Sequence, residues 1–125
     1  MPNPWYRPDF AKRGGLVPAV VQDASSREVL MLGWVNEEAW DLTLSSNKAT
    51  FWSTSRQELW VKGATSGDEL RMVEVRVDCD DDTVLYLVEP LGQGACHTKN
   101  GSGRARATCF FRRVDAQGRL INLDP

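Results

Sequence analysis

The sequence predicts an α+β fold, made mostly of β-strands arranged in hairpins, with one clear short helix. Three observations support this fold class: β-rich runs recur at short intervals, clusters of turn residues separate them, and one segment carries the signals of a helix start. A chain of 125 residues has room for one domain and little more. We therefore expect an N-terminal arm over residues 1–14, which has three prolines among its first eight residues, and a single domain over residues 15–125.

The first folded element is expected to be a β-hairpin. Residues 16–22 and 28–35 are both rich in β-forming residues, and a polar turn at residues 23–27 separates them. Pro18 lies inside the first of these runs and has no backbone N–H to donate. We therefore expect that strand to lie at the edge of its sheet or to carry a bulge.

A helix should follow the hairpin. Asn36 precedes two glutamates, and an asparagine cap followed by acidic residues is typical of a helix start. The helix should end near residues 46–47.

A loop rich in glycine, asparagine and serine should cover residues 91–103, and a turn at residues 115–118 should precede a short tail. Further strands are expected at residues 49–53, 58–62, 70–77, 83–88 and 108–114.

The composition argues against several classes of protein. Fifteen basic residues against 17 acidic ones give a net charge of −2, whereas nucleic-acid binders carry a positive excess. No apolar run approaches the roughly 20 residues of a membrane span, and the first residues lack the apolar stretch of a signal peptide. Three cysteines do not suggest a disulfide framework. We expect reduced thiols in a cytoplasmic protein without nucleic-acid or membrane partners.

Acidic residues cluster directly after the expected strand at residues 70–77. If that strand continues, Asp78, Asp80 and Asp82 share one face and Cys79 points to the other, because side chains alternate along a strand. Three carboxylates on one face suit a hard cation such as Mg²⁺. The alternative is a solvated acidic turn between two strands. Closely spaced aspartates repel one another, and a bound cation would relieve that repulsion.

The three cysteines, Cys79, Cys96 and Cys109, do not have the paired spacing of structural zinc modules. Scattered thiols are often small buried hydrophobic residues. Cys96, however, stands beside His97 in a polar loop, where an apolar side chain has little reason to be. Three thiolates would leave one position open on a tetrahedral zinc ion, which is the catalytic rather than the structural pattern.

A further candidate site is the segment from Lys62 to Gly67, which also contains the hydroxyls of Thr65 and Ser66. Its backbone N–H groups could cradle a phosphate, although flexible hairpin loops use the same residues. Arg106 belongs to a group of late basic residues that fit either phosphate binding or a solvated patch. Several aromatic residues fit a core or a dimer interface better than a base-stacking platform. They are Trp34, Trp40, Phe51, Trp52 and Trp60.

Taken in chain order, these motifs resemble those of the phosphoribosyl-AMP cyclohydrolases, which are hydrolases of histidine biosynthesis. The resemblance extends from about residue 15 to residue 113. It implies an enzyme that adds hydroxide at C6 of the adenine ring of phosphoribosyl-AMP and breaks the N1–C6 bond. The motifs that carry it are LVPAVVQD (16–23), VLML (29–32), NEEA (36–39), FWSTSR (51–56), LWVKGATSG (59–67), VDCDDD (77–82), ACHT (95–98) and CF (109–110).

The resemblance also implies two metals and an intertwined homodimer whose zinc site takes ligands from both subunits. The implied Mg²⁺ ligands are Asp78, Asp80 and Asp82, and the implied Zn²⁺ ligands are Cys79, Cys96 and Cys109. We assign acid–base catalysis to His97, the only imidazole, or else a hydrogen bond to a thiolate ligand. The expected substrate-binding residues are Trp52, Ser53, Ser55, Arg56, Lys62, Thr65, Ser66, Gly67 and Arg106.

Two departures from the family pattern leave alternatives open. Twelve residues separate Cys96 from Cys109, more than is usual in the family, although the inserted segment 99–105 could loop out at small cost. Ala64 stands where the family often has glutamate. The chain could therefore be a non-catalytic nucleotide- or metal-binding module on the same fold, or a related ring hydrolase for another purine nucleotide.

Overall fold

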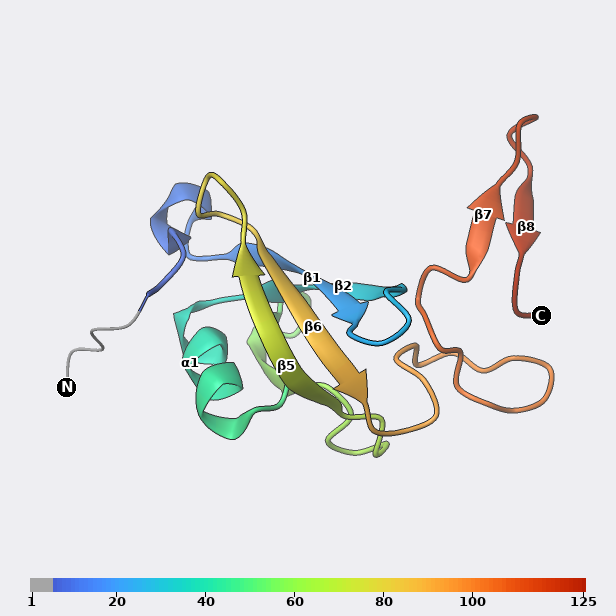
Figure 1. Cartoon of the computed structure of the whole chain (residues 1–125), viewed down its shortest axis with the longest axis horizontal. Coiled ribbons are helices and arrows are strands. Elements are labelled where there is room, and N and C mark those ends of the chain that lie inside the picture. The colour runs from blue at the N-terminus through green and yellow to red at the C-terminus, as the bar shows by residue number, and fades with distance from the viewer. Residues whose placement is uncertain (1–5) are drawn as a thin grey trace.

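The computed structural model describes residues 6–125 and has an α+β architecture, mostly strands in hairpins with one α-helix, as predicted (Figure 1). The elements are η1 (Phe10–Arg13), β1 (Val17–Asp23), β2 (Val29–Val35), α1 (Glu37–Ser46), β3 (Thr50–Ser53), β4 (Glu58–Val61), β5 (Leu70–Val77), β6 (Val84–Pro90), β7 (Arg112–Val114) and β8 (Leu120–Asn122). A four-stranded sheet with the order β2-β1-β6-β5 forms the centre, and two separate hairpins, β3–β4 and β7–β8, lie outside it.

Two hairpins make up the central sheet. β1 pairs with β2 and β5 pairs with β6, both antiparallel, while β1 and β6 pair in parallel from Ala19 and Val84 onward. The predicted first hairpin is confirmed. Of the two alternatives that Pro18 suggested, the edge strand is wrong, whereas the strand does carry a register irregularity, although not at Pro18 itself. β1 is an inner strand, and its irregularity falls between Val21 and Gln22. Pro18 is tolerated because it stands one residue before the parallel ladder begins.

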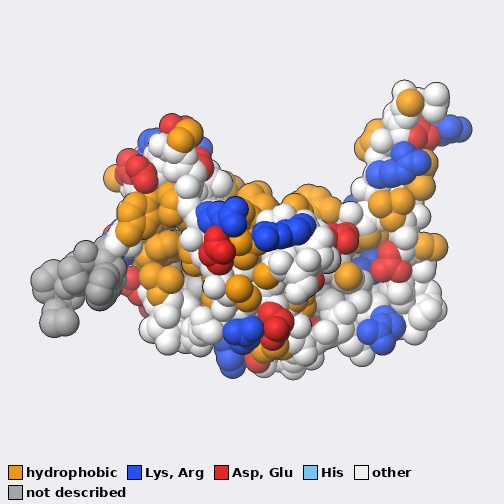
Figure 2. All heavy atoms as spheres, viewed as in Figure 1, with side chains coloured by type: hydrophobic (Ala, Val, Ile, Leu, Met, Phe, Trp, Pro, Cys, Tyr) orange, Lys and Arg blue, Asp and Glu red, His pale blue; other side chains and the backbone are white. Residues whose placement is uncertain are grey.

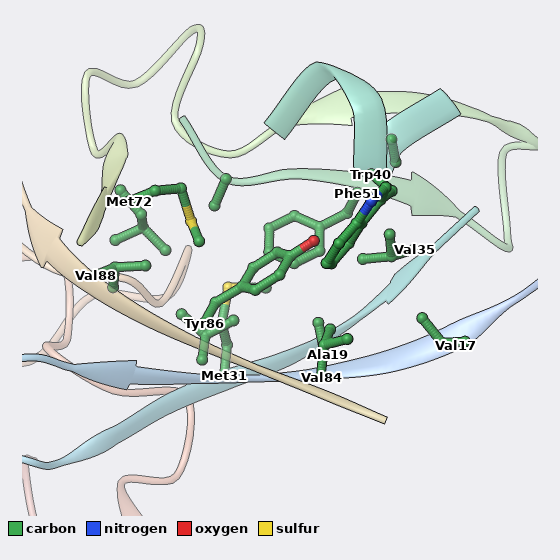
Figure 3. Close-up of a cluster of buried hydrophobic side chains, with 14 of the residues drawn as sticks. Val17, Ala19, Met31, Val35, Trp40, Phe51, Met72, Val84, Tyr86 and Val88 are labelled. Atoms are coloured by element: carbon green, nitrogen blue, oxygen red, sulfur yellow. The ribbon is translucent and has the colours of Figure 1, made fainter. Parts of the chain in front are cut away.

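The hydrophobic core lies between one face of the sheet and the layer formed by α1 and the β3–β4 hairpin. Asn36 caps α1 as predicted, since its side-chain oxygen accepts a hydrogen bond from the backbone N–H of Ala39. Tyr86 of β6, Phe51 of β3 and Trp40 of α1 point toward one another in this core (Figure 3). The Tyr86 ring centroid lies 6.2 Å from that of Phe51 and 6.4 Å from that of Trp40.

Gly33 of β2 allows the β3–β4 hairpin to pack closely on the sheet. A Cβ atom at this position would overlap the ring of Phe51, which is completely buried. Because a buried ring has little room to shift, we expect Gly33→Ala to lower the free energy of unfolding by about 1–3 kcal/mol. Chemical denaturation measures this loss. Gly101→Ala is the matched control, since the nearest atom to a Cβ there is 3.5 Å away. Equal unfolding midpoints for the two variants would contradict the packing argument.

The segment before the last hairpin differs from the prediction. We expected a strand over residues 108–114 followed by a tail, but the strand β7 begins at Arg112 and pairs with β8, which forms from that tail. Residues 108 and 109 bond to β2 instead. The hydroxyl of Thr108 donates to the carbonyl of Val29 (2.7 Å), and the backbone N–H of Cys109 donates to the carbonyl of Leu30 (2.7 Å). These bonds fix Cys109 against the central sheet.

The predicted N-terminal arm is described only from residue 6 onward, so its first five residues lie outside the described part of the chain. Residues 6–14 contain η1, and the Phe10 side chain is buried in the core. None of the helices in residues 6–125 has the length and hydrophobicity that a bilayer-spanning segment requires.

Candidate active site

A tight turn over residues 78–82, which we call the acidic turn, gathers three of its carboxylates. The strand β5 ends before this turn, so strand alternation does not place the side chains as predicted. Instead, the Asp78 carboxylate accepts hydrogen bonds from the backbone N–H groups of Asp82 (3.1 Å) and Thr83 (3.2 Å). Carboxylate oxygens of Asp78, Asp80 and Asp82 thereby come within 4.8 Å of one another. Cys79 lies on the same turn, and its thiol lies 3.7 Å from an Asp80 carboxylate oxygen.

The carboxylate of Asp78 is held in its charged form. Desolvation alone would raise its pKa, but the backbone N–H groups of Asp82, Thr83 and Asp80 outweigh that effect and hold the pKa below its usual value. An ionised carboxylate offers its oxygens to a cation without first losing a proton. The arrangement therefore fits a divalent metal ion with oxygen ligands.

Residues of η1 supply positive charge to the acidic turn. The Lys12 ammonium lies 3.2 Å from the Asp82 carboxylate and donates to the backbone carbonyl of Asp80 (3.1 Å). The Arg13 guanidinium lies 3.3 Å from the same carboxylate and donates to the carbonyl of Asp82 (2.8 Å). Asp82 is buried, so these two cations offset the cost of desolvating its charge.

Two of the three cysteines lie together. The thiols of Cys96 and Cys109 are close enough for each to shift the pKa of the other, although residues 99–105 loop out between them. Cys79, by contrast, stays on the acidic turn. Cys79 and Cys109 are exposed, whereas Cys96 is buried. Among residues 6–125, the one group of three close metal-ligating side chains is that of Asp78, Asp80 and Asp82. A single chain therefore brings together two of the three thiols named in the sequence prediction.

The paired thiols differ in their tendency to ionise. Burial raises the pKa of Cys96, but the Thr98 hydroxyl and backbone N–H, the Cys109 thiol and the charge of Arg106 outweigh it, so the pKa lies below its usual value. Partial burial and the neighbouring Cys96 raise the pKa of Cys109 to about 11, and the charge of Lys62 opposes this. Cys96 is therefore the readier thiolate, and Cys109 needs a cation beside it to ionise at neutral pH.

A cleft of about 340 Å³ gathers the motif around residues 52–56 with His97. Of the predicted site residues, Trp52, Ser53, Ser55, Arg56 and His97 all line it. The other lining residues are Leu32, Gly33, Trp34, Thr54 and Trp60. The sequence favours a core or interface role for Trp34 and Trp60, and their place in the cleft is a finding of the structure. The alternation along β2 could have indicated Trp34, since its neighbours Gly33 and Val35 are buried.

The remaining predicted binding residues are dispersed. Thr65, Ser66 and Gly67 are exposed on the loop after β4, whereas Lys62 is buried and its ammonium donates to the carbonyl of Asp68 (3.3 Å). Burial lowers the pKa of Lys62, and Asp68 and the two thiols oppose this. Arg106 is partly buried near Cys96. Its side chain is engaged with neighbouring segments of the same chain.

Comparison with known proteins gives one consistent result. Residues 31–111 match the family model described as phosphoribosyl-AMP cyclohydrolase. The chain is 53% identical over 117 residues to the phosphoribosyl-AMP cyclohydrolase of Desulfatibacillum aliphaticivorans, covering 94% of this chain and 89% of that protein. It is 52% identical over 101 residues to the protein of the same name from Archaeoglobus fulgidus, covering 81% of this chain and 87% of that protein.

Proposed function

Because the chain belongs to the phosphoribosyl-AMP cyclohydrolase family, we propose that it opens the adenine ring of phosphoribosyl-AMP in histidine biosynthesis, as a cytoplasmic, zinc- and magnesium-dependent homodimer. The observation that carries this proposal is the cleft. It places three tryptophans, a hydroxyl-rich turn and the only histidine of the chain beside one another, and His97 directly follows Cys96 in the sequence. Those groups suit an aromatic base, a phosphate and a proton transfer.

The donor set of the cysteines suits zinc. Cys96 and Cys109 lie side by side, and thiolates are preferred ligands of this ion. Three thiolates would hold it with one position left for water, so we propose Cys79 of a second subunit as the third ligand. When bound, zinc would lower the pKa of a water molecule toward neutrality and so favour its attack on carbon.

Exposed apolar residues support the homodimer. The face of the central sheet opposite the core leaves Leu32 49% exposed and Trp34 36% exposed. Both also line the cleft, so a second subunit on this face would border the substrate site. A hollow lined by Val20, Val77 and Leu85 extends from this sheet to Asp78 of the acidic turn. Figure 2 shows apolar side chains along the floor between two projections, which Figure 1 identifies as η1 with the acidic turn and the β7–β8 hairpin. A second copy of the chain in this hollow would bury the apolar surface and bring in the missing thiol.

We assign the steps of ring opening to residues of the cleft. Trp52, Trp34 and Trp60 would pack against the faces of the base, and Ser53, Ser55 and Arg56 would bind a phosphate. His97 would accept the proton of the attacking water as its oxygen bonds to C6. It would return that proton to N1 as the N1–C6 bond breaks, while the remaining O–H proton passes to the exocyclic nitrogen on C6 and leaves a carboxamide. One water molecule is thereby consumed. The exposed loop with Thr65, Ser66 and Gly67 would contact the second phosphate, with Lys62 behind it.

Magnesium is proposed to bind at the acidic turn through Asp78, Asp80 and Asp82, and would help to bind a phosphate of the substrate. Asp80→Asn is expected to raise the Mg²⁺ concentration that gives half-maximal activity by about tenfold or more, because one charged ligand becomes neutral. Asp81→Asn is the matched control, since Asp81 lies on the same turn but outside the close group. The same Mg²⁺ titration for both variants would count against this site.

One assay tests the proposed reaction. Purified protein loaded with zinc and magnesium is incubated with phosphoribosyl-AMP, and the change in absorbance on ring opening is followed. Turnover supports the proposal in spite of Ala64. Binding of the nucleotide without turnover would favour a non-catalytic module. Turnover of another N1-substituted purine nucleotide instead would favour a related ring hydrolase.

A further inference from the structure

Arg106 lies where three segments of the chain meet. Its guanidinium donates through Nε to the backbone carbonyl of Asp124 (2.8 Å) and through one terminal nitrogen to the hydroxyl of Thr98 (3.1 Å). The group also stacks over the ring of Phe111, with 4.1 Å from its central carbon to the ring centroid. A side chain with two hydrogen bonds and a stacked face has little left to offer a phosphate. Its contacts point to a role inside the protein.

The hydrogen bonds from Arg106 lead to the zinc-ligand candidate Cys96. A guanidinium only donates, so the Thr98 oxygen accepts the bond from Arg106. The single proton of that hydroxyl is then free to donate to the Cys96 sulfur, which lies 2.8 Å away. The backbone strengthens the link, because the Cys96 N–H donates to the carbonyl of Arg106 (3.0 Å) and the Arg106 N–H to that of Thr98 (3.0 Å).

The inserted segment 99–105 and the last residues of the sequence hold this arrangement in place. The Asn100 side chain donates to the Asp124 carboxylate (3.0 Å), and the Gly101 N–H donates to the carbonyl of Pro125 (3.1 Å). These contacts fix the Asp124 carbonyl that accepts from Arg106. The insertion therefore has a structural partner on which the orientation of Arg106 depends.

We propose that Arg106 is a positioning residue for the Cys96 thiolate, acting through the Thr98 hydroxyl, rather than a ligand of a substrate phosphate. The inference rests on the proposed function, in which Cys96 binds zinc. A hydroxyl that accepts from a cation donates more strongly, so the pair fixes the direction in which the sulfur faces a metal ion. Groups that orient a metal ligand in this way are worth about 10–100-fold in metal affinity.

The test compares Thr98→Val, Arg106→Gln and the double variant with the wild-type dimer. Zinc affinity is measured by competition with a chromophoric chelator, and the thiolate-to-metal absorption of the cobalt-substituted protein reports on the sulfur ligands. We expect each single variant to lose about 10–100-fold in zinc affinity. The double variant should lose no more than the weaker-binding single variant, because both changes break one chain of hydrogen bonds. Arg104→Gln is the control, since Arg104 is exposed on the same insertion.

The possible results distinguish a failure of the inference about Arg106 from a failure of the proposed function. The inference would be overturned if both single variants kept the wild-type zinc affinity and Arg106→Gln had a raised KM. That result would favour a role for Arg106 in binding a substrate phosphate. Additive losses in the double variant would also overturn it. Wild-type protein that binds no zinc at all would overturn the proposed function itself. Thr98→Val keeps the shape of the side chain, so it remains informative even where Arg106→Gln fails to fold.

Discussion

Replacing His97 with alanine is expected to reduce kcat by about 10²–10⁴-fold, because no other imidazole is present to move the proton between water and N1. His97 lines the cleft but is exposed, so its removal leaves no buried cavity. Zinc content and the thermal unfolding midpoint should therefore stay close to the wild-type values. Steady-state kinetics with metal analysis of the same samples measures both.

A chemical rescue distinguishes proton transfer from a structural role. Imidazole added to His97→Ala should restore part of kcat, whereas the same addition to wild-type protein should change nothing. Retained turnover without rescue would remove His97 from the mechanism. Loss of zinc together with loss of activity would instead indicate that His97 hydrogen-bonds to the Cys96 thiolate.

Two inactive cysteine variants are expected to restore each other when they are mixed. Under the proposed shared zinc site, Cys79→Ser and Cys109→Ser should each lose zinc and activity as homodimers, because every site would lack one thiolate. Unfolding the two together and refolding them produces mixed dimers. In a mixed dimer, one of the two sites combines a wild-type Cys79 with the wild-type Cys96 and Cys109 of the other subunit.

Random reassociation makes half of the dimers mixed, and each has one intact site of two, so we expect about a quarter of the wild-type activity. Cys96→Ser mixed with Cys109→Ser is the matched control, since both thiols belong to the same half of the site. That mixture should stay inactive. Restoration in the control but not in the first mixture would contradict a zinc site shared in this way.

Much of the fold follows from local signals in the sequence. Asn36 and the acids after it start α1, and the turn residues between β-rich runs separate the strands. The role of β1 could not be predicted from its sequence. Pro18 suggests an edge, but a parallel neighbour is supplied by β6 from a distant part of the chain, and periodicity carries no information about that pairing.

The candidate site shows the same division between local and distant information. The aspartates of the acidic turn are close in sequence, so their meeting could be predicted, although a turn rather than a strand brings them together. Cys96 and Cys109 were expected to share a site because of the family motifs. The inward engagement of Arg106 and the burial of Lys62 depend on contacts with Asp124 and Asp68, which composition and spacing do not reveal.

The parallel pairing of β1 with β6 also has a consequence for how the chain reaches its native state. Ala19 pairs with Val84, a separation of 84 − 19 = 65 residues, so the sheet remains divided until residue 84 is available. Bringing together residues so far apart in the sequence costs loop-closure entropy before the new contacts stabilise the sheet. Such pairings therefore slow folding. During synthesis, the β1–β2 hairpin would form before β6, and the edge of β1 that later pairs with β6 would be unpaired. Until β6 is available, chaperones or neighbouring nascent chains would be able to bind that edge.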